Sequence, residues 1–114
     1  MLKHVLARIE RTPIAAFVLL GLAMSPLLAQ ADGVIRQAAT NFAPRQIEIQ
    51  RGASLQITNN DPFVHHVYVD SSEMKFDSGE QRPNQSVTIR FDEAGSFVVH
   101  CAIHLKMRLS VTVR

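Results

Sequence analysis

Short alternations of apolar and polar residues fill the chain from Val34 onward, with no helical periodicity of useful length. They are rich in Val, Ile, Thr and Phe and are separated by Gly, Pro, Asn and Asp, which favour turns. The segment 71–81 is the least strand-like and is predicted to form a loop, with room for a helical turn. The pattern predicts an all-β fold, a Greek-key sandwich or barrel of about seven or eight strands. The predicted strands lie near Val34–Ala39, Gln46–Gln50, Ser54–Asn59, Val64–Asp70, Ser86–Phe91, Ser96–Cys101 and Arg108–Arg114.

Strand alternation also predicts which side chains face the core, because successive side chains of a strand point to opposite faces. In the sixth predicted strand, Cys101 ends the apolar, core-facing row, whereas His100 faces the other way and is expected to be exposed. In the fourth predicted strand the apolar row carries His65 inward and leaves His66 outward.

The first thirty or so residues have a different character. Basic residues precede an apolar run at Ile14–Leu22, and small residues follow at positions 29–31. This order predicts a secretory signal peptide over residues 1–31, cut before Asp32, and a single exported domain over 32–114. The protein would then be periplasmic and free of the membrane after cleavage. An uncleaved N-terminal anchor is the alternative. The basic residues concerned are Lys3, Arg8 and Arg11.

Removing this leader takes away more basic than acidic side chains, so the remaining domain has balanced charge. A nucleic-acid partner held by bulk charge is therefore not expected. The domain also contains a single cysteine, Cys101, which excludes an intramolecular disulfide. In an exported domain this small, an unpaired thiol is expected to be partner-seeking, reactive or metal-bound.

The residues after this cysteine add two further donors. Cys101, His104 and Met107 follow one another at three-residue steps, between two predicted strands. A short loop can turn a thiolate, an imidazole and a thioether toward one point, and the inward His65 can supply a fourth donor. His66 is a rival for that role, and an isolated Met107 could equally be a core residue.

Two imidazoles, a thiolate and a weak thioether suit copper in both oxidation states. Zinc accepts His and Cys but seldom methionine. Iron–sulfur clusters need more cysteines than this chain has.

In these features the chain resembles the cupredoxins, and its C-x2-H-x2-M spacing is similar to that of amicyanins among the small plastocyanin-like members. The likeness extends over nearly the whole exported region, through the order and spacing of several stretches. These stretches are Ile47–Gly52, Leu55–Asp61, Phe63–Val67, Phe76–Gly79 and Gly95–Cys101.

The resemblance implies a type I blue-copper site with one copper per chain, cycling between Cu(II) and Cu(I). Cys101 would be the thiolate ligand that gives the blue colour, His65 and His104 the imidazole ligands, and Met107 the axial sulfur. Electrons would pass at the edge of His104, beside Leu105 and either Phe63 or Pro62. Redox partner proteins of cytochrome, dehydrogenase or oxidase type would dock there on a monomeric carrier.

Lys106 and Arg108 lie near that edge and suggest an acidic rim on the partner. The chain also departs from the family pattern at three places. His66 stands where the family commonly has an Asn that ties two ligand loops. Ala102–Ile103 replaces the frequent Thr-Pro, and no proline follows His104.

The sequence is compatible with three functions. The first is a blue-copper shuttle of single electrons between exported partners, which is not an enzyme and has no catalytic residues. The alternative is a periplasmic copper-binding or delivery protein using the same ligands. The third is a thiol enzyme with Cys101 as nucleophile and His104 or His65 as its base, which would leave Met107 without a role.

Overall fold

The computed structural model describes residues 31–114, which form nine strands and no helix. The predicted signal peptide therefore lies, except for residue 31, outside the described residues. Within this part of the chain there is no helix of the length and apolarity that a membrane crossing requires. The strands are β1 (Gly33–Ala38), β2 (Asn41–Ala43), β3 (Gln46–Ile49), β4 (Ser54–Asn59), β5 (Val67–Asp70), β6 (Lys75–Asp77), β7 (Ser86–Arg90), β8 (Gly95–Cys101) and β9 (Arg108–Val113).

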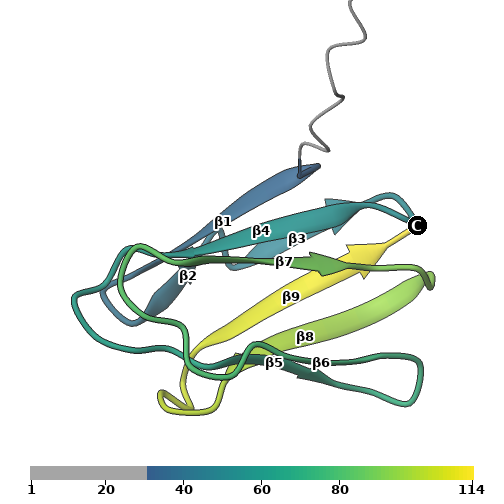
Figure 1. Cartoon of the computed structure of the whole chain (residues 1–114). Helices are drawn as coiled ribbons and strands as arrows, with labels where there is room; N and C mark the ends of the chain where they lie inside the picture. Colours follow the sequence, from purple (N-terminus) through teal and green to yellow (C-terminus); the bar gives the residue numbers. More distant parts are fainter. Residues whose placement is uncertain (1–30) are drawn as a thin grey trace, which may run out of the picture.

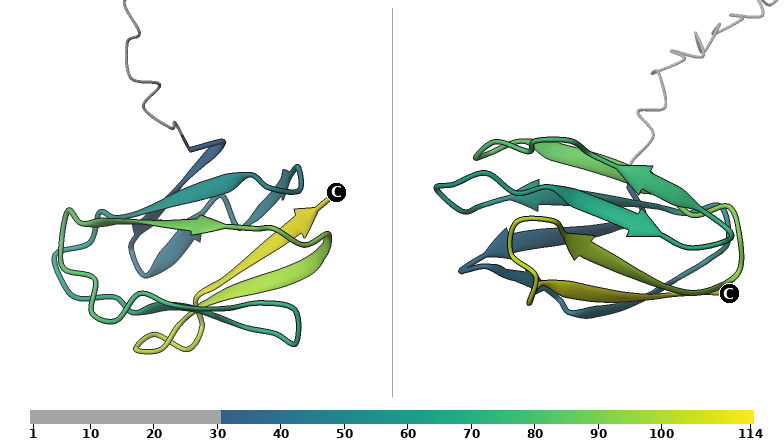
Figure 2. Two further views of the ribbon diagram at one scale, coloured as in Figure 1. Left: turned by 45° about the vertical axis from the view of Figure 1, so that its right-hand side comes forward. Right: turned by 90° about the horizontal axis from the view of Figure 1, so that it is seen from below.

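The strands form two sheets that face each other (Figure 1). One sheet has the order β2-β1-β4-β7 and the other the order β3-β9-β8-β5-β6. The pairs β1–β4 and β3–β9 are parallel, and the remaining pairs are antiparallel. Two further views show the same layers, with β8 and β9 side by side in each (Figure 2). The predicted all-β sandwich is confirmed, with one or two more strands than expected.

The core lies between the sheets because each strand alternates in burial. In β9 the apolar residues Leu109, Val111 and Val113 are buried, and the residues between them are exposed. In β8 the core-facing row ends at Cys101, as predicted. The buried residues Val67 and Val69 of β5 lie on the same face as the buried His65, which also agrees with the prediction. Burial of each large aliphatic side chain contributes about 1.5–3 kcal/mol, which gives each strand a defined inner face.

Three expectations about the elements were wrong. The segment 71–81 is not only a loop, because it contains the edge strand β6 in antiparallel pairing with β5. Strand β2 was missed, since the turn before it has positive φ at Ala39 and Thr40, where glycine or asparagine is expected. The fourth predicted strand begins only at Val67, because His65 makes an isolated bridge to Gln81 instead of joining the ladder.

The strand directions bring four connections to one end of the sandwich. The β1–β2 turn, the segment 60–66 after β4, the segment 78–85 before β7 and the loop 102–107 between β8 and β9 all lie there, on the left in Figure 1. We call residues 102–107 the ligand loop. The predicted metal ligands are all on or next to these connections.

Candidate metal centre

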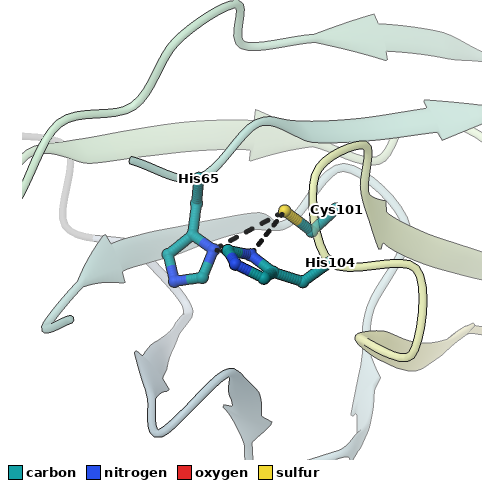
Figure 3. A group of neighbouring side chains, drawn as sticks. All are labelled: His65, Cys101 and His104. Carbon is teal, nitrogen blue, oxygen red and sulfur yellow. Dashed lines mark hydrogen bonds between the residues drawn. The ribbon is translucent and has the colours of Figure 1, made fainter. Parts of the chain in front are cut away.

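Three of the predicted ligands converge at this end. The thiol sulfur of Cys101 lies 3.5 Å from Nδ1 of His65 and 3.8 Å from Nδ1 of His104. The two Nδ1 atoms are 3.2 Å apart. Figure 3 shows the three side chains pointing toward one another, His65 from one segment and Cys101 and His104 from the end of β8 and the loop that follows it. Their donor atoms all lie within 4.8 Å of each other, so this group can hold a single metal ion.

The spacing fits a metal ion well. Bonds of about 2.0 Å to nitrogen and about 2.3 Å to sulfur place such donors about 3 to 4 Å apart around one ion. The donor set of one thiolate and two imidazoles fits copper, which accepts trigonal His₂Cys coordination with a weak axial ligand. The residues present therefore fit the ion that the sequence predicts.

Backbone hydrogen bonds between two strands hold Cys101 in place. It pairs with Val67 across β5 and β8 and is 1% exposed. The N–H of His66 donates to the Cys101 sulfur at 3.4 Å, and the carbonyl of His66 accepts the N–H of Ala102 at 2.8 Å. The strand pairing and these two hydrogen bonds fix the direction of the sulfur toward the two histidines.

The position of His65 is fixed at both backbone and ring. Its backbone N–H and carbonyl both bond to Gln81, at 2.9 and 2.8 Å, and the residue is completely buried. Nε2 lies 2.8 Å from a carboxylate oxygen of Asp61. Because a carboxylate only accepts, Nε2 carries the proton and Nδ1 presents its lone pair to the group.

Asp61 is a buried carboxylate with donors on both oxygens. Burial would raise its pKa, but the hydrogen bond from His65 and the backbone N–H groups of Thr40 and Ala39 outweigh that cost. The pKa of Asp61 is therefore lower than usual, and the group is ionised at neutral pH. No part in the metal site was predicted for Asp61 from the sequence. Its place four residues before His65 was the available signal.

Met107 is the last residue of the ligand loop and is buried in the core. It is 2% exposed, and its backbone N–H donates to the carbonyl of His104 at 2.9 Å, which closes the end of the loop. The role of its thioether as a fourth donor stays a prediction.

His66, the rival ligand, lies outside the converging group. Its ring Nε2 bonds to a carboxylate oxygen of Asp77 at 2.5 Å. The N–H of Gly79 and the bond from His66 together lower the pKa of Asp77. The ring of His66 thus ties the end of β6 to the site, and only its backbone reaches the cysteine sulfur.

The outward prediction for His100 was only partly right. Its ring does face away from the core, but it is half-buried rather than exposed, since it stacks on Tyr68 with ring centroids 5.1 Å apart. Burial and the nearby Arg108 lower the pKa of His100, against an opposing effect of Asp70. Cross-strand stacking of this kind depends on register between β5 and β8, which the sequence alone does not reveal.

The other side of the group opens to solvent. His104 is half-buried, and the ring of Phe63 lies with its centroid 5.2 Å from that of His104. Phe63, Ile103 and Leu105 are exposed apolar residues, and Leu105 is 79% exposed. Phe63 and Leu105, which were predicted to lie beside the electron port at His104, are therefore exposed, and the port itself stays a prediction.

The comparisons with known proteins agree with this geometry. A family model described as copper binding proteins of the plastocyanin/azurin family matches residues 29–114. No curated protein sequence matches the chain.

Solved structures with the same fold include the Cu(I) form of a methionine-to-alanine mutant of amicyanin, with a TM-score of 0.69 and 22% identity over 75% of this chain and 85% of that one. A reduced tryptophan-to-tyrosine mutant of amicyanin has a TM-score of 0.67 and 24% identity over 75% and 87%. The copper-containing nitrite reductase from Thermus scotoductus SA-01 has a TM-score of 0.65 and 22% identity over 71% of this chain but only 22% of its own.

Proposed function

The chain belongs to the plastocyanin/azurin family of copper-binding proteins, and from this premise we propose that it carries single electrons between exported partner proteins. In this proposal one copper ion is held by His65, Cys101, His104 and Met107. The protein is a carrier and not an enzyme. The observation that supports this most directly is the convergence of a buried cysteine sulfur with two imidazole Nδ1 atoms.

The residues of the site account for a carrier's main requirements. Copper supplies the one-electron chemistry. Cys101 is held at the end of β8, His65 by its bridge to Gln81, and both by further hydrogen bonds, so these two ligands are fixed before any metal binds. Such fixed ligands would keep reorganisation small when copper changes its oxidation state. The buried thioether of Met107 would be the weak sulfur donor of the set.

The partner surface in this proposal is the apolar rim around His104. Phe63 lies against the His104 ring, Ile103 and Leu105 flank His104 in the sequence, and all three are exposed, so a partner that covers them would exclude water between the two redox centres. The partners are redox proteins of cytochrome, dehydrogenase or oxidase type. The carrier itself is monomeric and periplasmic, released by cleavage of the signal peptide over residues 1–31.

A cleft next to the ligand loop is lined by basic residues and makes this part of the surface positively charged. Arg45, Lys106 and Arg108 contribute to a cleft of about 270 Å³, and within residues 31–114 none of the three forms a salt bridge. Unpaired cations beside a docking patch favour a partner with an acidic rim and increase the association rate at low salt.

Copper delivery remains a second candidate because one ligand is accessible. His104 is half-buried on a loop, so an acceptor's ligand can approach the metal from that side. An enzymatic role of the nitrite reductase kind is not proposed, since the likeness extends over less than a quarter of that protein's chain.

The decisive experiment is an optical and electron paramagnetic resonance spectrum of residues 32–114 with one equivalent of Cu(II). We expect an intense visible sulfur-to-copper transition and a narrow hyperfine splitting. A pale solution with a tetragonal signal would contradict the proposed ligand set. Voltammetry and a chelator challenge then separate the two candidates: a carrier cycles reversibly and retains copper, whereas a delivery protein releases it readily.

A further inference from the structure

We propose that Asp61 is a positioning residue for the copper site, which fixes both the proton and the orientation of the His65 ring. This inference rests on the proposed role of His65 as a ligand. It assigns a function to a carboxylate that does not itself face the converging donors.

The contacts of Asp61 leave its carboxylate no freedom to turn. One oxygen accepts the N–H of Ala39 at 2.7 Å, and the other accepts the N–H of Thr40 at 3.1 Å and Nε2–H of His65 at 2.8 Å. The side chain is 6% exposed, so water does not compete for these bonds to any great extent. Three donors from two separate segments therefore set the direction of the oxygen that His65 meets.

The β1–β2 turn supplies two of those donors through an unusual backbone. Ala39 and Thr40 have φ angles of 50° and 56°, a left-handed conformation that costs energy for non-glycine residues and most for a β-branched one. In this conformation both N–H groups point to the carboxylate. The bonds to Asp61 offset the cost of the turn, and the turn in return anchors Asp61.

Asn59, at the end of β4, also holds Asp61 in place. Its side-chain oxygen accepts the N–H of Asp61 at 2.9 Å, and its amide nitrogen donates to the carbonyls of Phe63 and Gln81 at 2.8 and 3.0 Å. Gln81 is also the residue whose backbone pairs with His65. Carboxylate, imidazole and backbone are thus joined in one buried polar network.

The function of this network is to select the tautomer of the His65 imidazole. A neutral imidazole offers only one nitrogen to a metal, and here the unprotonated one must be Nδ1, because only Nδ1 lies near Cys101 and His104. The Asp61 carboxylate holds the proton on Nε2. Loss of such a partner typically weakens metal binding by about 10- to 100-fold.

The test compares Asp61→Asn with Asp77→Asn, because Asp77 also accepts a histidine Nε2 but its partner, His66, lies outside the ligand group. Copper affinity is measured by competition with a chelator, together with the hyperfine splitting and the reduction potential. We expect Asp61→Asn to weaken Cu(II) binding by about 10- to 100-fold and to alter the spectrum, and Asp77→Asn to change neither appreciably. An Asp61→Asn protein that is less stable but binds copper with unchanged affinity and spectrum overturns the proposal.

A second measurement needs neither copper nor a variant. Nitrogen-15 NMR of the metal-free wild-type protein reports which nitrogen of His65 carries the proton. A proton on Nε2 supports the proposal, and a proton on Nδ1 overturns it even if Asp61→Asn does not fold. If the metal-free result supports the proposal while Cu(II) gives no blue spectrum, the proposed function fails and the inference about the His65 ring stands.

Discussion

His65 and Cys101 belong to the framework of the sandwich and are 0% and 1% exposed, whereas His104 lies on a loop beside the largely exposed Leu105. The first two are held by paired backbone, by an N–H directed at the sulfur and by Asp61. The loop side is anchored by the bond from Met107 to the carbonyl of His104. The difference indicates separate roles within one site. His65 and Cys101 set the geometry of the ligands, and the side with His104 is accessible to solvent and to a partner.

The largest effect is expected from replacing the cysteine. Cys101→Ser removes the thiolate, so the intense visible absorption of the copper-loaded protein should disappear completely. The buried hydroxyl should also lower the free energy of unfolding by about 1–3 kcal/mol if it finds no partner. Absorption and thermal melting measure the two effects separately. A variant that remained intensely coloured would place the thiolate ligand elsewhere.

The two histidines allow the contrast between framework and loop to be tested directly. His65→Gly leaves a buried cavity and removes one of the three donors to Asp61, so we expect the free energy of unfolding of the metal-free protein to fall by about 2–5 kcal/mol. His104→Gly should cost far less, because its side chain is partly exposed.

Added imidazole should restore the copper spectrum of His104→Gly, since it can enter from solvent, and should not restore that of His65→Gly. Chemical denaturation measures the stability of the two variants, and optical titration with imidazole measures the rescue of their copper spectra. Equal rescue of both variants would show that the two sides are equally accessible.

Two substitutions of Met107 can distinguish its role in core packing from its role as a ligand. Met107→Leu keeps the side-chain volume and should change the free energy of unfolding by less than about 1.5 kcal/mol. Met107→Ala should cost about 2–5 kcal/mol. If the thioether is the axial ligand, Met107→Leu should raise the reduction potential, because a donor that stabilises Cu(II) is lost. Voltammetry with an unchanged potential would assign Met107 to the core alone.

The smallest structural effect is expected at Leu105. Leu105→Ala should leave stability within about 0.5 kcal/mol and the copper spectrum unchanged, as for most surface substitutions. It should slow electron self-exchange between two copies of the carrier, measured by NMR line broadening. Val34→Ala is the control, because Val34 is also an exposed apolar residue but lies on β1. Equal rates in both variants would place the electron port away from Leu105.

Much of this architecture could be predicted from local pattern. Alternation along β8 and β9 gave the inner faces, and spacing gave the loop that carries His104, because both depend on neighbours in sequence. The single cysteine drew attention to Cys101 before any geometry was known. The inward direction of His65 followed from the same alternation.

The parts that escaped prediction depend on distant contacts. The role of Asp61 requires the β1–β2 turn, where Ala39 and Thr40 are left-handed against local propensity and both donate their N–H groups to that carboxylate. Strand β6 is too short to show an alternation, and it forms because Phe76 packs partly against the core. The tie between His66 and Asp77 likewise joins residues whose proximity only the paired strands create.

Strand β9 lies between β3 and β8, so the edge of each of these strands that faces β9 stays unpaired until residues 108–113 take their place. Non-local pairing of this kind makes folding slow, because distant parts of the chain must meet before the interior closes. During that interval the Cys101 thiol lacks the burial that the folded domain gives it and is open to oxidants. The three donors converge only in the folded domain, so a reductant present during folding should increase the yield of protein that binds copper.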